Sequence, residues 1–359
     1  MALKNIFEDL LRCKSLKIRY FFLWVSAMGG FLFTFTGTRR RPELPNIIGD
    51  TLQLNEYRSN IHFPRSVLSE PSPMELLHLK DFKFVYNSTK ICREKPPFIL
   101  VLVHTAPNHF IHRKLIRNTW GSIRHIHNVT ISIGFLLGET DQRLQSRIRQ
   151  EKDQHHDIIQ GSFVDSYRNL SLKHIMGYKW ATEFCPKATF ILKLDDDVYV
   201  DTFQIVRFLL FTFGRSPTSV LACSVVSAGT LPHRNGKWGV TRKEFSFDTY
   251  PEYCSGMGYF VTLDIARDIL AASKRLPFFW VDDIFVTGIV AEALDLSRLP
   301  INAHTSDRPE DMINWLKQGK GPSPYIYITW MCYTMIMYND SEAERNIDER
   351  SDLQLCREL

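Results

Sequence analysis

Short apolar segments alternate with helix-like segments through the middle of the chain. Residues 98–104 (FILVLVH) and 129–138 (VTISIGFLLG) are nearly continuous apolar runs, which is typical of strands buried on both faces. Two further strand candidates are residues 188–195 (ATFILKLD) and 219–226 (SVLACSVV). Helices are expected at residues 112–121, in the charged stretch up to residue 155, at 170–184 and at 263–274. Strands that alternate with helices predict an α/β domain with a mostly parallel mixed sheet flanked by helices.

One apolar segment is long enough to cross a membrane. Residues 20–38 contain no charged side chain and lie between Arg19 and Arg39. As a helix they would extend about 28 Å, close to the hydrocarbon thickness of a bilayer. A cleaved signal peptide is the alternative, but the run is longer than a usual signal segment and no small-residue cleavage pattern closes it. We therefore expect a single transmembrane signal-anchor here, and the basic residues before it favour a cytosolic tail over residues 1–19, although basic residues also follow it.

The rest of the chain divides by composition into three parts. Residues 39–92 carry several prolines with scattered Ser and Asn and no sustained periodicity, which is typical of a stalk. The strand and helix patterns fill residues 93–310, which we expect to form the main folded domain. Residues 311–359 are expected to be a C-terminal extension that packs on this domain.

The charge distribution argues against nucleic acid as a partner. The chain has a formal net charge of +5, with 44% hydrophobic and 13% aromatic residues, enough apolar material for a large core. Residues 1–41 carry eight Lys or Arg against Glu8 and Asp9, so residues 42–359 carry a net charge of only −1. The positive charge therefore lies around the apolar segment and does not cover a folded surface that could neutralise phosphates.

Cysteine usage agrees with a location of the main domain in the secretory pathway. Six cysteines remain once Cys13 is assigned to the cytosolic tail, and they allow three disulfides in pairings that the sequence leaves open: Cys92, Cys185, Cys223, Cys254, Cys332 and Cys356. Sequons at Asn87, Asn128 and Asn339 are available for N-glycosylation if the chain is translocated. A fourth sequon, at Asn169, falls in a predicted helix and is not expected to be used.

Three consecutive aspartates follow the third strand candidate. Asp195, Asp196 and Asp197 lie in the segment KLDDDVYV (193–200), at the point where an apolar run ends. Ligands of open α/β sheets bind outside the carboxyl ends of strands. Adjacent carboxylates repel one another, and a divalent cation such as Mg²⁺ or Mn²⁺ would relieve that repulsion. The alternative is a solvated acidic turn.

A second acidic pair stands among apolar and aromatic residues. Asp282 and Asp283 lie in FFWVDDIFVTG (278–288), and carboxylates in such surroundings need a partner or a raised pKa. Either property makes them candidates for a general base, and the alternative is an N-terminal helix cap.

Two glycines and three tyrosines lie between the acidic segments, in YPEYCSGMGYFVT (250–262). Gly256 and Gly258 would let the backbone approach a sugar ring, on which the tyrosines could stack or to which they could donate hydrogen bonds. An ordinary turn with core packing explains the same residues.

Six segments in this order resemble the β-1,3-galactosyltransferase and β-1,3-N-acetylglucosaminyltransferase family of Golgi enzymes, glycosyltransferase family 31. The blocks that carry the resemblance are RKLIRNTWG (113–121), FLLG (135–138), DIIQGSFVDSYRNLSLK (157–173), KLDDDVYV, the YPEYCSGMGY block and VDDIFVTG. Together they cover roughly residues 98–305. Three positions depart from the family pattern, namely Leu115, Ser162 and Asp282.

The resemblance implies a GT-A-type nucleotide-sugar fold and an inverting transfer that forms a β-1,3 linkage. The donor would be a UDP-sugar, with galactose preferred over N-acetylglucosamine or N-acetylgalactosamine, and the acceptor a glycan on a glycolipid or glycoprotein. Mn²⁺ or another divalent cation would be the cofactor. The protein would be a single-pass type II protein of the Golgi membrane, with its catalytic domain in the lumen, and a homo- or hetero-oligomer is compatible with this. The alternatives are a non-catalytic glycan-binding relative and a membrane-tethered, cation-binding adhesion module.

The resemblance also implies roles for single residues. Asp195 and Asp197 correspond to the ends of the family's Asp-x-Asp motif, with Asp197 as the direct metal ligand and His304 completing the metal site. Asp283 corresponds to the base that takes the proton from the acceptor hydroxyl. Residues expected around the donor are Arg113, Arg117, Trp120, Asp165, Tyr167, Asn169, Lys173, Asp195, Asp196, Gly256 and Gly258.

Overall fold

The computed structural model describes residues 83–93, 95–126, 128–308, 311 and 327–329. Within this part of the chain, no helix combines the length and the apolar character that a membrane span needs. The predicted tail, the anchor at 20–38 and most of the predicted stalk and C-terminal extension lie outside the described residues, as do Asn339, Cys332 and Cys356.

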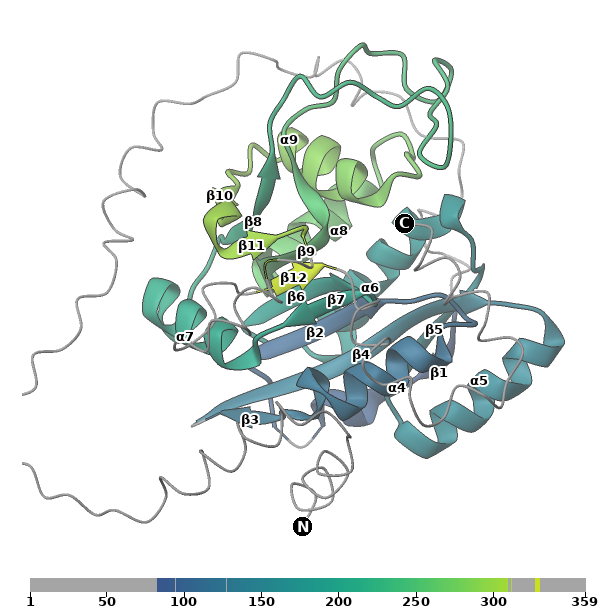
Figure 1. Cartoon of the computed structure of the whole chain (residues 1–359), viewed down its shortest axis with the longest axis vertical. Helices are drawn as coiled ribbons and strands as arrows, with labels where there is room; N and C mark the ends of the chain where they lie inside the picture. Colours follow the sequence, from purple (N-terminus) through teal and green to yellow (C-terminus); the bar gives the residue numbers. More distant parts are fainter. Residues whose placement is uncertain (1–82, 94, 127, 309–310, 312–326, 330–359) are drawn as a thin grey trace, which may run out of the picture. The chain divides into compact units, whose positions relative to one another are not determined.

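A mixed sheet of nine strands runs through the described domain (Figure 1). Its order is β1-β5-β4-β2-β6-β9-β8-β10, and β3 pairs with β4 beside this path. The strands are β1 (Phe84–Asn87), β2 (Ile99–His104), β3 (His125–Ile126), β4 (Val129–Glu139), β5 (Ile158–Val164), β6 (Phe190–Asp195), β8 (Leu221–Val226), β9 (Tyr253–Thr262) and β10 (Leu299–Pro300). A smaller sheet has the order β11-β12-β7 and contains β7 (Val198–Val200), β11 (Thr305–Ser306) and β12 (Tyr327–Thr329).

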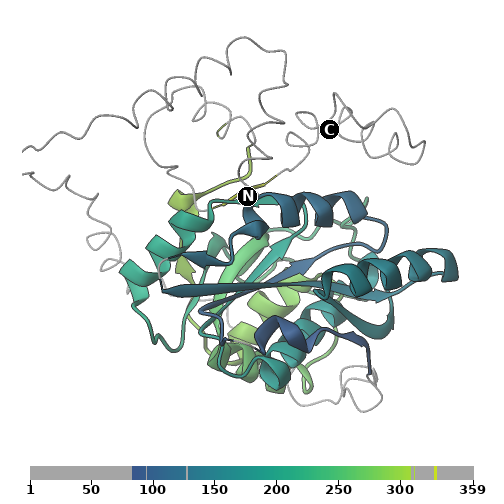
Figure 2. The same cartoon turned by 90° about the horizontal axis from the view of Figure 1, so that it is seen from below.

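Helices cover both faces of the large sheet, as predicted. They are α4 (Phe110–Asn118), α5 (Gln142–His155), α6 (Leu170–Phe184), α7 (Thr202–Phe213) and α8 (Leu263–Ser273). Side chains of β2 alternate between two cores: Leu100 and Leu102 pack with α6 and α8, whereas Val101 and Val103 pack with α4 and α7. Figure 2 shows the sheet edge-on between these two helical layers. The expected mixed sheet flanked by helices is confirmed.

The sheet is less parallel than the sequence predicted. β5, β4, β2 and β6 are parallel neighbours, but β9 lies antiparallel between β6 and β8, and β1 is antiparallel to β5. The reason lies in residues 250–262, for which an ordinary turn was one of the two interpretations and which instead contain the whole ten-residue central strand β9. Parallel pairing of β2 with β6 places His104 level with Asp195, so both strands end at the same edge.

The end of the predicted stalk belongs to the folded domain. β1 pairs with β5, and the disulfide Cys92–Cys185 joins the segment after β1 to the residue that follows α6. The boundary expected at residue 92 is therefore wrong for residues 83–92, because a four-residue edge strand is too short to give a sequence signal. A second disulfide joins Cys223 of β8 to Cys254 of β9.

Candidate active site

A buried lysine joins the two acidic segments. Lys193 of β6 is 2% exposed, and its Nζ donates to Asp195 Oδ1 at 2.7 Å and to the carbonyl of Gly256. The same ammonium lies 3.8 Å from Asp282 Oδ2. Burial alone would lower the pKa of Lys193, but the charges of Asp195 and Asp282 raise it above its usual value, so this group is a permanent cation. Lys193 was not singled out from the sequence, although it stands two residues before Asp195 and hence on the same face of the strand.

The outer aspartates of the triplet both have a raised pKa. Burial, followed by the charges of Asp197 and Asp282, raises the pKa of Asp195 to about 7 despite the contact with Lys193. Asp197 is exposed, and desolvation by the surrounding protein together with the charge of Asp196 raises its pKa. Two crowded carboxylates of this kind supply the hard oxygen ligands that Mn²⁺ or Mg²⁺ prefers, so these residues fit a divalent cation.

The carboxylate of Asp283 is held at the start of a short helix. Its Oδ1 accepts a hydrogen bond from the backbone N–H of Ile284 at 2.8 Å, where η8 (Ile284–Val290) begins. Burial and the charge of Asp282 raise its pKa to about 7. A carboxylate with a pKa near neutrality is suited to general-base catalysis. The contact with the Ile284 N–H is therefore compatible with the predicted role of Asp283 as a base, which stays a prediction.

Gly256 leaves room for the Asp283 carboxylate. A Cβ atom on Gly256 would lie 3.1 Å from Asp283 Oδ2. Gly258, in contrast, is buried in β9 opposite Leu194, and a Cβ there would lie 2.6 Å from Leu194 Cδ2. Gly258 was expected near the donor and instead serves the packing of two strands.

Asp282, the residue before Asp283, stays ionised and is held by a histidine. His174 Nδ1 lies 2.9 Å from Asp282 Oδ2, and the other ring nitrogen of His174 hydrogen-bonds to the Tyr259 hydroxyl. Burial disfavours the charge of Asp282, but Lys193 and His174 outweigh it and lower its pKa below the usual range. The two neighbouring aspartates therefore have opposite tendencies, which is how sites separate an acid–base group from a fixed charge.

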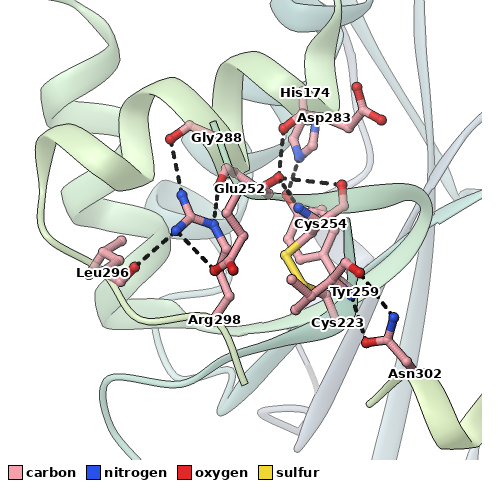
Figure 3. The surroundings of a disulfide bond; sticks show 12 residues. His174, Cys223, Glu252, Cys254, Tyr259, Asp283, Gly288, Leu296, Arg298 and Asn302 are labelled. Carbon is pink, nitrogen blue, oxygen red and sulfur yellow. Dashed lines mark hydrogen bonds and ion pairs between the residues drawn. A yellow bond between two sulfur atoms is a disulfide. The ribbon is translucent and has the colours of Figure 1, made fainter. Parts of the chain in front are cut away.

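Hydrogen bonds connect the second disulfide, Cys223–Cys254, to the backbone of Asp283 (Figure 3). The backbone N–H of Cys254 donates to Thr287 Oγ1 at 2.9 Å, and Thr287 Oγ1 donates to the carbonyl of Asp283 at 2.6 Å. Arg298 donates to the carbonyls of Thr287 and Gly288 at 2.7 and 3.1 Å, next to Glu252. These bonds fix the turn of η8 that carries Asp283 against β9.

Three residues expected at the donor are structural. Arg113 is fully buried and uses all five N–H groups on Glu151, Thr105 and the carbonyls of Ala106 and Pro107. Arg117 forms a two-bond pair with Asp157, at 2.7 and 2.8 Å, and also donates to Glu151. Trp120 is buried in the core between α4 and the sheet. Their assignment to the donor pocket is therefore corrected to positioning of α4 and of the loop after β2.

Asp165 and Lys173 hold the same loop from its other side. Lys173 Nζ donates to the Thr105 carbonyl at 2.7 Å and to Asp165 Oδ1 at 3.0 Å, and Asp165 Oδ2 accepts from the Gly138 N–H. Asn169 Nδ2 donates to the carbonyl of Val164 at 2.8 Å. The polar groups of Lys173, Asp165 and Asn169 therefore form hydrogen bonds within the protein. The residues after β2 are thus clamped between two buried cations, next to the aspartate triplet.

Asp197 and His304, the predicted metal ligands, do not belong to any histidine–carboxylate group that the described residues form. Among the described residues, two groups of histidine and carboxylate side chains are close enough to hold a metal, and neither includes Asp197 or His304. The His304 ring packs against Phe208 with centroids 5.6 Å apart. Its role as a metal ligand stays a prediction. Asp196 turns toward His109 and His112, two residues that the sequence analysis missed.

An exposed aromatic edge borders the acidic cluster. Tyr167 and Trp238 are 39% and 54% exposed, and Lys237 lies over both rings. Burial is the main cause that raises the pKa of Tyr167 to about 12, and the charges of Asp282, Asp283 and Asp195 add to it. Exposed aromatic faces of this kind are suited to stacking on sugar rings.

Sequence comparisons with known proteins match one family. The galactosyltransferase family matches residues 111–302. Human beta-1,3-galactosyltransferase 5 is 32% identical over 239 residues, covering 66% of this chain and 76% of the relative. Mouse beta-1,3-galactosyltransferase 1 is 32% identical over 206 residues, covering 57% of this chain and 63% of the relative. A solved glycosyltransferase involved in glycosylation of the major capsid of PBCV-1 aligns with a TM-score of 0.37 at 14% identity, covering 65% of this chain and 93% of that one. With its family-matching region spanning the aspartate triplet, Gly256 and Asp283, this chain belongs to the galactosyltransferase family.

Proposed function

We propose that the protein is an inverting β-1,3-galactosyltransferase that transfers galactose from UDP-galactose to a glycan hydroxyl. The observation that carries the proposal is the junction at Lys193, where the aspartate triplet and the Asp282–Asp283 pair meet at the carboxyl edge of β6. A cation site for the leaving nucleotide and a base for the incoming hydroxyl have to be neighbours in a single displacement. Membership of the galactosyltransferase family supports the choice of sugar.

Each acidic residue has a defined part in this proposal. Asp195 and Asp197 would hold Mn²⁺, which when bound supplies positive charge to the pyrophosphate of the leaving UDP. Asp283 accepts the proton of the acceptor hydroxyl at its carboxylate. Asp282 and Lys193 stay ionised and fix the electrostatic field around Asp283. A single attack without a covalent intermediate inverts the anomeric centre.

The aromatic edge formed by Tyr167 and Trp238 supports a sugar acceptor. It borders the carboxylates and offers exposed ring faces. We further propose a GT-A-type arrangement of the domain, anchorage by residues 20–38, a lumenal orientation in the Golgi and N-glycosylation at Asn87, Asn128 and Asn339. Whether the acceptor is carried on lipid or protein is left to experiment.

The test is a donor screen with the full chain purified in detergent. We expect UDP release and acceptor modification with UDP-galactose and Mn²⁺, and loss of both with a chelator. Asp283→Asn should bind UDP as the wild type does but transfer at least about 100-fold more slowly, which is the usual contribution of a general base. Asp268→Asn, at an exposed aspartate on α8, is the matched control and should be fully active.

Two outcomes would reject this assignment. Full turnover by Asp283→Asn would remove the proposed base. Transfer of another UDP-sugar at a higher kcat/KM than UDP-galactose would reject the donor while leaving the mechanism in place.

A further inference from the structure

A cluster of two histidines and one aspartate lies beside the proposed cation site, and the proposed reaction uses neither of its histidines. His109 precedes α4, His112 lies in its first turn, and Asp196 is the middle residue of the aspartate triplet. The Asp-x-Asp pattern assigns its end residues to the catalytic cation and gives the middle one no ligand role. In this chain the middle position is a carboxylate that contacts His109 and His112 at the start of α4.

The ligand atoms of this cluster converge. His109 Nδ1 lies 2.9 Å from Asp196 Oδ2 and His112 Nδ1 lies 3.4 Å from Asp196 Oδ1, and all three ligand atoms fit within 4.8 Å of one another. Ligand atoms about 2.1 Å from a tetrahedral zinc ion are about 3.4 Å apart, and the two histidine–aspartate separations lie within about 0.5 Å of that spacing. The two histidines are three residues apart, which places them on one face of the helix end.

The cluster has the support and the access that a metal site requires. Thr105 Oγ1 donates to Asp196 Oδ2 and is itself held by Arg113, so the carboxylate is oriented from behind. The side chains of His109 and His112 are 30% and 14% exposed, which leaves an entry path from solvent. Two imidazoles with one carboxylate suit zinc, whereas Mn²⁺ and Mg²⁺ prefer sites made of oxygen ligands.

The second histidine–carboxylate group among the described residues lacks both solvent access and a full set of free ligand atoms. His104, His174 and Asp282 are buried, and both ring nitrogens of His174 are already hydrogen-bonded. The Lys193 ammonium lies 3.8 Å from Asp282 and would repel a cation. That group is suited to holding Asp282 in place and not to binding a metal.

We propose that His109, His112 and Asp196 form a zinc site separate from the cation site of the proposed transferase reaction. The three protein ligands leave a coordination position open to water or to an anionic group. Bound zinc would place a second divalent charge one residue away from both Asp195 and Asp197. The charge of the bound zinc would therefore change the electrostatic potential at the proposed cation site and so affect donor binding.

The test measures zinc affinity and not transfer. The metal-free full chain, supplied with saturating Mn²⁺ to fill oxygen-ligand sites, is titrated with Zn²⁺ against a chromophoric chelator. The double variant His109→Gln/His112→Gln should lose one equivalent of bound zinc or weaken its affinity at least about tenfold, since even loss of an outer-shell partner costs that much. His125→Gln, an exposed histidine on β3, is the matched control and should bind zinc as the wild type does.

Cobalt gives an independent reading of the same site. Co²⁺ bound to the wild type should show the visible absorption of a four-coordinate nitrogen and oxygen site, and the double variant should lose it. If the double variant unfolds, the single variant His109→Gln, at the more exposed histidine, replaces it. Equal zinc affinity in the variants and the wild type, or no zinc uptake by the wild type, overturns the proposal. Because the measurement is zinc affinity, absence of galactosyl transfer would reject the proposed function but not the zinc site. Normal transfer would likewise not support a zinc site that fails to bind zinc.

Discussion

Replacing Gly256 by alanine should slow turnover without unfolding the protein. The new Cβ would lie 3.1 Å from Asp283 Oδ2, whereas ordinary van der Waals contacts begin at 3.4 Å, so the carboxylate must move by about 0.3 Å. Misplacement of a reacting group by about 1 Å costs about 100-fold in rate, and scaling that loss logarithmically to 0.3 Å gives about fourfold. We therefore expect kcat to fall about fourfold while KM for UDP-galactose changes little.

Gly258→Ala is the matched comparison for this prediction. Its Cβ would lie 2.6 Å from Leu194 Cδ2 and 3.1 Å from the Lys193 carbonyl, in the packed contact between β9 and β6. Overpacking of this kind costs about 1–3 kcal/mol of stability, so the variant should unfold at lower temperature. Steady-state kinetics and thermal unfolding of both variants decide the issue. A Gly256→Ala enzyme with wild-type kcat would refute the role of this glycine in placing Asp283.

Three further predictions follow from the buried charges and the disulfides. Because a base must be ionised and Asp283 has a pKa raised to about 7, kcat/KM should fall as the pH drops below about 7; a profile that is flat between pH 5.5 and 8 would argue against it. Arg113→Met should lower the free energy of unfolding by about 3 kcal/mol in urea titrations, because it leaves the buried Glu151 with one cation fewer, and an unchanged midpoint would contradict this. Replacing both Cys92 and Cys185 by serine opens a loop closed over a sequence separation of 93 residues and should cost about 2–5 kcal/mol, visible as a lower Tm than that of the wild type without reductant, and an unchanged Tm would contradict this.

The sequence predicted the parallel core of the fold well. Strands β2, β4, β6 and β8 follow from short apolar runs, and α6 begins and ends at the residues expected. Such segments are buried on both faces, so their composition alone identifies them. β9 escaped prediction because Gly256 and Gly258 within it are typical of turns, and only its neighbours in the sheet make it a strand.

The site was predicted in part, for a physical reason. Carboxylates after strands and within apolar segments stand out, so Asp195, Asp197 and Asp283 could be proposed as site residues from the sequence, and their roles stay predictions. Arg113 and Lys173 were placed at the donor, but a buried cation with a buried partner has the same sequence appearance as one that binds a ligand. The contact of Asp196 with His109 and His112 joins residues about 85 positions apart, which no local pattern records.

Calorimetric titration with UDP tests the central claim most directly, namely that the aspartate triplet holds a cation that binds the nucleotide. The full chain should bind UDP with Mn²⁺ present and lose that binding when Mn²⁺ is chelated, and Asp197→Ala should bind UDP weakly under both conditions. Equal affinity of the wild type with and without Mn²⁺, or of Asp197→Ala and the wild type with Mn²⁺, would contradict the account.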